Sequence, residues 1–191
     1  MADATLLPAP SQTTGPYLSI GLLGDFIGSS LVPEDDPRAV RIRGRLLDGN
    51  GDPVPDGMVE IWQANAAGRY AHPEDARGDI PLEEGFVGFG RSGTTDDGWF
   101  EFVTVKPGRV PAPDDGLQAP HLVVIVFARG LLKQLVTRLY FPDEAQANAA
   151  DPVLSELDDA ERASLVARAE NGSLLFDIHL QGDAQTTFFA V

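Results

Sequence analysis

The chain has 191 residues, 43% of them hydrophobic and 8% aromatic, which suits one globular domain with a sizeable core. Its 29 acidic and 14 basic side chains give a formal charge of -15, and no cluster of lysine or arginine interrupts it, which argues against nucleic acid as a partner. The absence of cysteine excludes disulfides and thiolate metal sites, and no apolar run approaches the roughly 18 residues that a membrane-spanning helix requires.

The first 38 residues are expected to form an N-terminal arm and a loop. Residues 1–16 contain three prolines and no hydrophobic periodicity, which favours an extended arm. The sequence T-T-G-P-Y at 13–17 indicates a rigid, docked turn at its end. The N-terminus has no basic region followed by an apolar segment, so we expect a cytoplasmic location.

Short strands and turns follow from residue 39 onward. Residues 40–46 alternate apolar and arginine side chains, which predicts a strand with one buried face. Turn residues separate it from a second strand at 58–64, where Trp62 is expected to pack in the core. A long polar loop over 65–85 precedes an aromatic and β-branched strand at 99–105.

Residues 122–128 are apolar without alternation, which predicts a strand covered on both faces in the middle of the core. His121 and Arg129 flank this run. His121 is either a strand-end histidine satisfied by the backbone or a functional group, and Arg129 is either paired with an acidic neighbour or available to a ligand. Because the overall charge repels anionic molecules, a site for one needs a sheltered cation, and Arg129 is the candidate.

The last third of the chain combines helix and strand signals. Residues 143–150 and 158–169 favour two short peripheral helices, and Asp158 with Glu161 resembles a capping box. Residues 174–180 alternate as a strand with His179 on the solvated face, and residues 186–191 are expected to form an edge strand.

Together these elements predict an all-β fold, an antiparallel β-sandwich of about seven or eight short strands with long loops. We expect a single domain over residues 1–191. The sandwich is assigned to 39–191, with a helical insertion at about 143–170.

Four segments, taken in order, resemble the intradiol ring-cleavage dioxygenases. They are I-R-G-R-L-L-D-G-N-G-D-P-V-P-D-G-M-V-E-I-W-Q-A-N-A-A-G-R-Y at 42–70, F-G-R-S-G-T-T-D-D-G-W-F-E-F-V-T-V-K-P-G at 89–108, the A-P-H strand that ends in F-A-R-G, and L-V-T-R-L-Y-F-P-D-E. The resemblance implies a ferric, non-haem enzyme that opens a catechol ring between its hydroxylated carbons with both atoms of dioxygen. In this family two tyrosines and two histidines hold the iron, a donor set that suits Fe(III).

This chain departs from the family at the ligands. Val110 stands where a tyrosine follows K-P-G, Val123 stands where the second histidine belongs, and no tyrosine lies near Gly78, where the remaining ligand falls. His121 is left as a vestigial ligand, and Gln118 replaces an arginine. The resemblance therefore implies that this chain holds no metal, and that a homologous beta subunit binds Fe(III) in a heterodimer that assembles further.

The resemblance also implies an active site at the junction of the two chains. This subunit supplies its T-x-G-P-Y turn and the arginine of F-A-R-G to a pocket for a small aromatic acid and dioxygen. A guanidinium suits a ring carboxylate, and a rigid turn shapes an apolar wall. The implied substrate-binding residues are Thr13, Gly15, Pro16, Tyr17 and Arg129.

Two other interpretations remain open from the sequence. The pattern G-x-L-x-D-x-x-G-x-P-V also occurs in transthyretin-like domains, which suggests a non-catalytic β-sandwich binding module. A self-sufficient metalloenzyme would use His72, His121, His179 and either Tyr70 or Tyr140, although no ligand-type spacing joins them.

Overall fold

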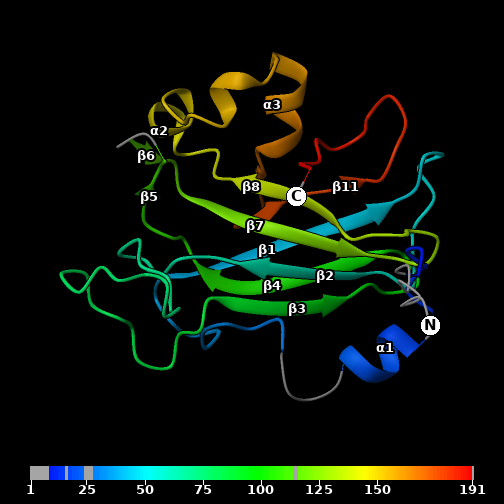
Figure 1. Cartoon of the computed structure of the whole chain (residues 1–191), viewed down its shortest axis with the longest axis horizontal. Coiled ribbons are helices and arrows are strands. Elements are labelled where there is room, and N and C mark those ends of the chain that lie inside the picture. The colour runs from blue at the N-terminus through cyan, green and yellow to red at the C-terminus, as the bar shows by residue number, and fades with distance from the viewer. Residues whose placement is uncertain (1–8, 16, 24–27, 114–115, 191) are drawn as a thin grey trace, which may run out of the picture.

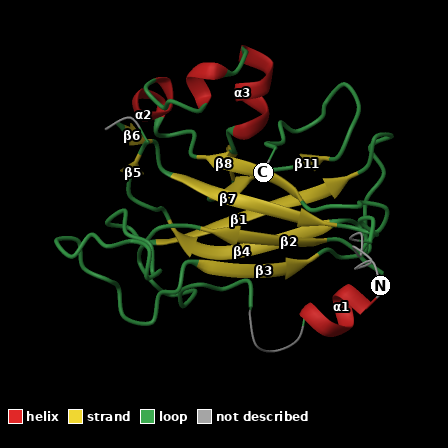
Figure 2. Ribbon diagram, viewed as in Figure 1, coloured by secondary structure: helices red, strands yellow, loops and turns green. Residues whose placement is uncertain are grey.

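The computed structural model describes residues 9–15, 17–23, 28–113 and 116–190. Within these ranges the strands form a five-stranded sheet, a four-stranded sheet and a two-stranded ladder (Figure 1). The helices are few and lie outside the sheets (Figure 2). None of the helices in this part of the chain is long and apolar enough to cross a membrane.

Strand β1 (Ala39–Leu47) organises the five-stranded sheet. Ile42 and Leu46 on its inner face are 1% and 0% exposed, whereas Arg43 is exposed, so the predicted alternation is confirmed. One edge of β1 pairs antiparallel with β4, and the other edge pairs parallel with β10 and then β11. The other strands of this sheet are β4 (Trp99–Val105), β9 (Arg168–Glu170), β10 (Ser173–Leu175) and β11 (Ile178–His179).

The prediction of an all-β, antiparallel fold is confirmed in part: most described elements are strands and most pairs are antiparallel, but this sheet is mixed. The chain leaves the other sheet through a helical region and returns beside β1 in the same direction. A parallel pair needs such a long crossover. Hydrophobic alternation shows which face of a strand is buried, but it does not show in which direction a distant partner runs.

The four-stranded sheet has the order β3-β2-β7-β8. Strand β7 (His121–Phe127) lies between β2 and β8, so the prediction of a central strand is confirmed. A short ladder of β5 and β6 precedes it along the chain. The remaining bounds are β2 (Met58–Trp62), β3 (Phe89–Gly93), β5 (Val110–Pro111), β6 (Leu117–Gln118) and β8 (Leu135–Tyr140).

One hydrophobic cluster takes buried side chains from both larger sheets, so their inner faces enclose a common core. Full burial of each such side chain stabilises the fold by about 1.5–3 kcal/mol. The prediction that the strand at 122–128 is covered on both faces is wrong, because Val123, Ile125 and Phe127 alternate with the buried residues of β7 and are only half-buried. The core members include Ile42, Leu46, Val59, Ile61, Phe100, Phe102, Leu122, Val124 and Val126.

The predicted strand at 174–180 is interrupted, because the backbone turns in toward β1. A Cβ on Gly44 would lie 1.8 Å from the carbonyl oxygen of Phe176, so only glycine fits there. Asp177 completes the pairing, since its Oδ1 accepts a hydrogen bond from the backbone N–H of Arg45 at 3.0 Å. This contact separates β10 from β11.

The prediction of an edge strand at 186–191 is wrong for the residues that the structure describes, 186–190. Phe189 makes one isolated bridge to Val136, and Val191 lies outside the described ranges.

Directly after the segment predicted as an extended arm, residues Tyr17–Leu22 form the short helix α1, which the sequence did not predict. Its first turn begins where the N–H of Leu18 donates to the carbonyl of Gly15 at 3.1 Å, and Leu18 is buried. Burial of this side chain gives the segment a reason to fold that its composition does not reveal.

The two predicted peripheral helices exist as α2 (Ala145–Ala149) and α3 (Asp159–Leu165), with a 3-10 turn, η1 (Leu154–Glu156), between them. The predicted capping box is confirmed, since Asp158 and Glu161 exchange side-chain to backbone hydrogen bonds of 2.8 and 2.9 Å. Helix α3 ends four residues before the predicted Ala169, because Arg168–Glu170 pair with β10 as β9.

Candidate functional site

Arg129 lies in the turn after β7, and this turn is at the opposite end of that strand from His121. Its side chain is 73% exposed, and its Nε lies 3.0 Å from Oδ2 of Asp56. The interpretation of Arg129 as the partner of an acidic neighbour is therefore confirmed. An ion pair this exposed contributes little stability, so it does not by itself explain an arginine at this position.

Thr13 lies against the same turn. Its Oγ1 accepts a hydrogen bond from the backbone N–H of Gly130 at 2.8 Å. Gly130 has a φ of 95°, a conformation that glycine adopts without strain. The structure thus brings Thr13 next to Arg129, two of the five residues that the resemblance assigns to substrate binding.

For the other three residues predicted to contact the substrate, the structure shows less of the position or of the side chain. Gly15 is exposed, and apart from its chain neighbours no atom of the described residues lies within 4 Å of the position that a Cβ would take. Pro16 lies outside the described residues. Tyr17 begins α1, and its side chain is also outside the described part of the chain.

Arg91 links α1 to the four-stranded sheet through hydrogen bonds. Its Nη1 donates to the carbonyl of Leu22 at 2.8 Å, and its Nε donates to Oε1 of Glu60 at 2.7 Å. Glu60 is 8% exposed, so this ion pair is largely buried and each charge depends on the other. Charged groups on β2 and β3 therefore hold α1, and the hydrogen bond of Thr13 to Gly130 holds the arm that precedes it.

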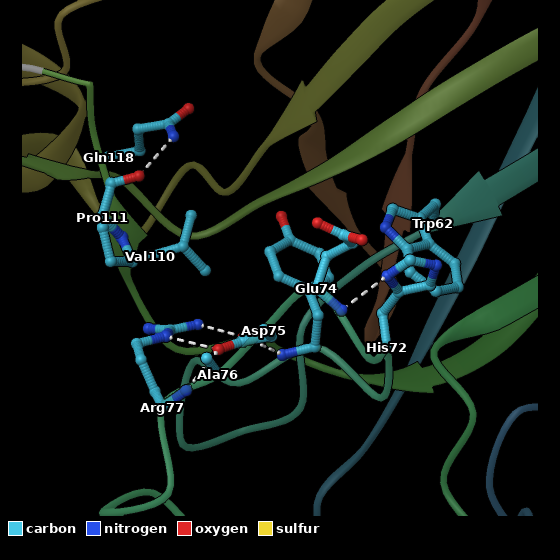
Figure 3. A pocket seen from close by; sticks show the side chains of 10 residues that line it. Trp62, His72, Glu74, Asp75, Ala76, Arg77, Val110, Pro111 and Gln118 are labelled. Atoms are coloured by element: carbon cyan, nitrogen blue, oxygen red, sulfur yellow. Dashed lines mark hydrogen bonds and ion pairs between the residues drawn. The ribbon is translucent and has the colours of Figure 1, made fainter.

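A pocket of about 750 Å³ opens on the sheet beside the other end of β7 (Figure 3). Trp62 stacks on Tyr70 with ring centroids 5.9 Å apart and planes 9° from parallel. The prediction that Trp62 packs in the core is wrong, because it is half-buried and lies under the loop at 65–85. The lining residues are Trp62, Tyr70, His72, Glu74, Asp75, Ala76, Arg77, Val110, Pro111 and Gln118.

Positions where this chain departs from the family pattern, at the ligands and beside them, gather at this pocket. Val110 and Gln118 line it, and so does Arg77, the neighbour of Gly78 (Figure 3). Val123 pairs in register with Trp62 and therefore points to the same face of the sheet. Valine has no donor atom and a guanidinium repels cations, so these residues do not fit a ferric ion.

His121 is held as a structural residue. It is 5% exposed, and its Nδ1–H donates to the carbonyl of Ala119 at 2.8 Å, so the interpretation of a strand-end histidine satisfied by the backbone is confirmed. Burial, followed by the charge of Arg138, lowers the pKa of His121 to about 4. Within the described ranges no group of three or more His, Cys, Asp or Glu side chains lies close enough together to hold a metal.

Arg138 is a residue that the sequence did not single out. It pairs in register with Val123, so its side chain lies on the pocket face of the sheet. Its Nη1 donates to Oε1 of Gln118 at 2.7 Å and to the hydroxyl of Tyr140 at 3.2 Å. The sequence does carry a signal that could have identified Arg138, since it is a single arginine in an otherwise uncharged strand.

The histidines of the proposed self-sufficient metalloenzyme are not brought together. His72 stands edge-on to Trp62 at the pocket, with centroids 6.1 Å apart, whereas His179 belongs to β11 in the other sheet. Tyr140 is buried, and its hydroxyl lies 3.3 Å from Oδ1 of Asp151. These placements do not support that interpretation.

Comparison with known proteins adds an independent finding. Residues 28–182 match the family model described as Dioxygenase. The chain is 42% identical over 203 residues to the protocatechuate 3,4-dioxygenase alpha chain of Burkholderia cepacia, a match that covers 98% of this chain and 99% of that protein. It is 37% identical over 175 residues to the beta chain from the same organism, which covers 85% of this chain and 74% of the relative.

A solved structure agrees with these matches. The dioxygenase domain of a dioxygenase and carbohydrate-binding protein fusion from Streptomyces sp. SirexAA-E superposes with a TM-score of 0.59 and is 26% identical. The superposition covers 92% of this chain and 99% of that domain.

Proposed function

Because the chain belongs to the intradiol ring-cleaving dioxygenases, we propose that it is the alpha subunit, without iron of its own, of a protocatechuate 3,4-dioxygenase. Such an enzyme cleaves protocatechuate with dioxygen to 3-carboxy-cis,cis-muconate, a step of the beta-ketoadipate pathway. Greater identity to an alpha chain than to a beta chain supports this assignment. Family membership also favours an enzyme subunit over a transthyretin-like binding module.

The observation that carries the proposal is the chemistry at the lost ligand positions. Val110 and Val123 cannot coordinate a metal, and His121 donates its Nδ1 proton to a backbone carbonyl. The iron of the enzyme is therefore assigned to a partner, a homologous beta subunit that binds Fe(III). The two chains form a heterodimer, and heterodimers assemble into a larger oligomer.

This chain's part in the active site is assigned to the arm and the turn after β7. Thr13, Gly15, Pro16, Tyr17 and Arg129 are proposed to contact protocatechuate. The hydrogen bond between Thr13 and the turn supports this grouping, because it places the arm beside Arg129. A guanidinium there offers paired donors to the carboxylate of the substrate.

The test is to compare the purified chain with the chain co-expressed beside a homologous beta subunit. Alone, the chain should contain no stoichiometric iron, show no visible phenolate-to-iron absorption and leave protocatechuate intact. The co-purified complex should be coloured, contain ferric iron and cleave the ring. A coloured and active chain without a partner would contradict the proposal, and isolation only as a lone monomer would favour the binding module.

A further inference from the structure

The pocket beside β2 is suited to a flat ring. Trp62 and Tyr70 together form an aromatic wall, and Val110 and Pro111 lie across the pocket from Trp62 (Figure 3). The volume of about 750 Å³ lies within the range of roughly 300–1,000 Å³ that is usual for small-molecule sites. An aromatic ring between these walls would bury apolar surface on both faces.

One arginine lines the pocket, and a second lies behind its lining. Arg77 lines it but is paired with Asp75, whose Oδ1 accepts from Nε at 2.8 Å. Arg138 lies behind Gln118, half-buried, and has no carboxylate within 4.0 Å in the part of the chain that the structure describes. A partly desolvated charge without an ion-pair partner is unfavourable, so an anion near Arg138 would be stabilised.

Nearby carboxylates do not already supply that anion. Asp151 reaches Arg138 only through the hydroxyl of Tyr140, and its oxygens accept hydrogen bonds from three backbone amides at 2.7–3.0 Å. Glu74 lines the pocket but is exposed, so solvent screens its charge.

Tyr70 offers the pocket a hydrogen-bond donor. Its hydroxyl makes no hydrogen bond to any described residue. Burial raises the pKa of Tyr70, against the opposing charges of Arg138 and Arg77, so the group keeps its proton at neutral pH. A phenol that retains its proton can donate to a carboxylate.

We propose that this pocket binds a small planar aromatic carboxylate, with its ring against Trp62 and Tyr70 and its carboxylate on the side of Tyr70 and Arg138. This site is separate from the one assigned to Arg129. The seven residues of β7 between the two ends span roughly 20 Å. The proposal therefore does not depend on the proposed function, and it needs no metal.

The test uses the full chain with Trp99→Phe, which leaves Trp62 as its single tryptophan. Titration with benzoate should give a saturable change in Trp62 fluorescence. Arg138→Gln should weaken benzoate binding about tenfold, the effect of losing one charge-assisted interaction. Tyr70→Phe, which keeps the aromatic wall and removes the donor, should weaken it by a factor of about three to ten.

The control ligand is benzyl alcohol, which carries the same ring without the charge. It should bind more weakly than benzoate and with no dependence on Arg138. Arg43→Gln, the same change on the exposed face of β1 in the other sheet, should leave the titration unchanged, and circular dichroism should show that each variant is folded. Absence of a saturable change, equal binding of the two ligands, or an unaltered affinity in folded Arg138→Gln would each overturn the proposal. Because benzoate is not cleaved and no partner is present, failure here is distinguishable from failure of the proposed function.

Discussion

The hydroxyl of Thr13 accepts a hydrogen bond from the backbone N–H of Gly130 at 2.8 Å, although the two residues are 117 positions apart. This bond joins the N-terminal arm to the turn that presents Arg129. The arm and the arginine therefore form one structural unit, and a change in either should affect the other.

Thr13→Val should loosen this unit. Valine keeps the shape of threonine but cannot accept the hydrogen bond, so the arm should lose about 0.5–1.5 kcal/mol of docking free energy. In the complex with the beta subunit we expect a several-fold increase in KM for protocatechuate and faster proteolysis of the arm. Thr14→Val, the same change one residue later, is the matched control and should leave both measurements unchanged. Equal effects in the two variants would show that the hydrogen bond is irrelevant.

Arg129→Leu should weaken substrate binding in the same complex. Loss of a charge-assisted pair with a carboxylate costs about 1.5–3 kcal/mol, which corresponds to a KM at least tenfold higher. Iron content should not change. Lys133→Leu removes a positive charge from the same turn and should have little effect, which separates a specific contact from general electrostatic attraction. Unchanged kinetics in Arg129→Leu would remove this residue from the site.

Glu60→Gln should destabilise the fold by about 3 kcal/mol, because it leaves the largely buried guanidinium of Arg91 without its counter-charge. Urea unfolding of the full chain measures this change. Glu101→Gln is the control, since Glu101 pairs with Arg41 and Arg43 on the exposed face of β1 and should cost less than about 1 kcal/mol. A similar loss in both variants would mean that burial of the first pair is unimportant.

His121→Asn should change the acid sensitivity of the fold. The folded chain holds the pKa of His121 at about 4, below the ordinary value of 6.5, so above pH 6.5 neither state binds the proton. As the pH falls from about 6.5 to about 4, the unfolded chain takes up a proton that the folded chain does not, and stability is lost. The wild type should lose roughly 3 kcal/mol more than the variant over this window. Parallel unfolding curves at every pH would contradict the assignment.

The local features of the fold could be predicted from the sequence because they depend on neighbouring residues. The face alternation of β1, the central place of β7 and the capping box at Asp158 each follow from side chains within one segment. The parallel pairing of β10 with β1 could not be predicted, since it depends on where a distant segment returns. Helix α1 was missed because the burial of Leu18 is a tertiary effect.

In the candidate sites too, some residues could be identified from the sequence and others could not. Arg129 stood out because it ends an apolar run in a strongly acidic chain, and the loss of ligands at Val110 and Val123 could be read from the family pattern. Arg138 could not be singled out, because its relation to Val123 is a matter of register between two strands. Trp62 was assigned to the core for a related reason, since its type indicates burial but not which face of β2 it occupies.

The parallel pairing of β1 with β10 and β11 has a consequence for biosynthesis. Strand β1 emerges early from the ribosome, but one of its edges stays open until the last segment of the chain has been made. An open edge on a nascent polypeptide can recruit foreign strands. Premature termination just before β10 should therefore yield an aggregating fragment rather than a shorter working subunit.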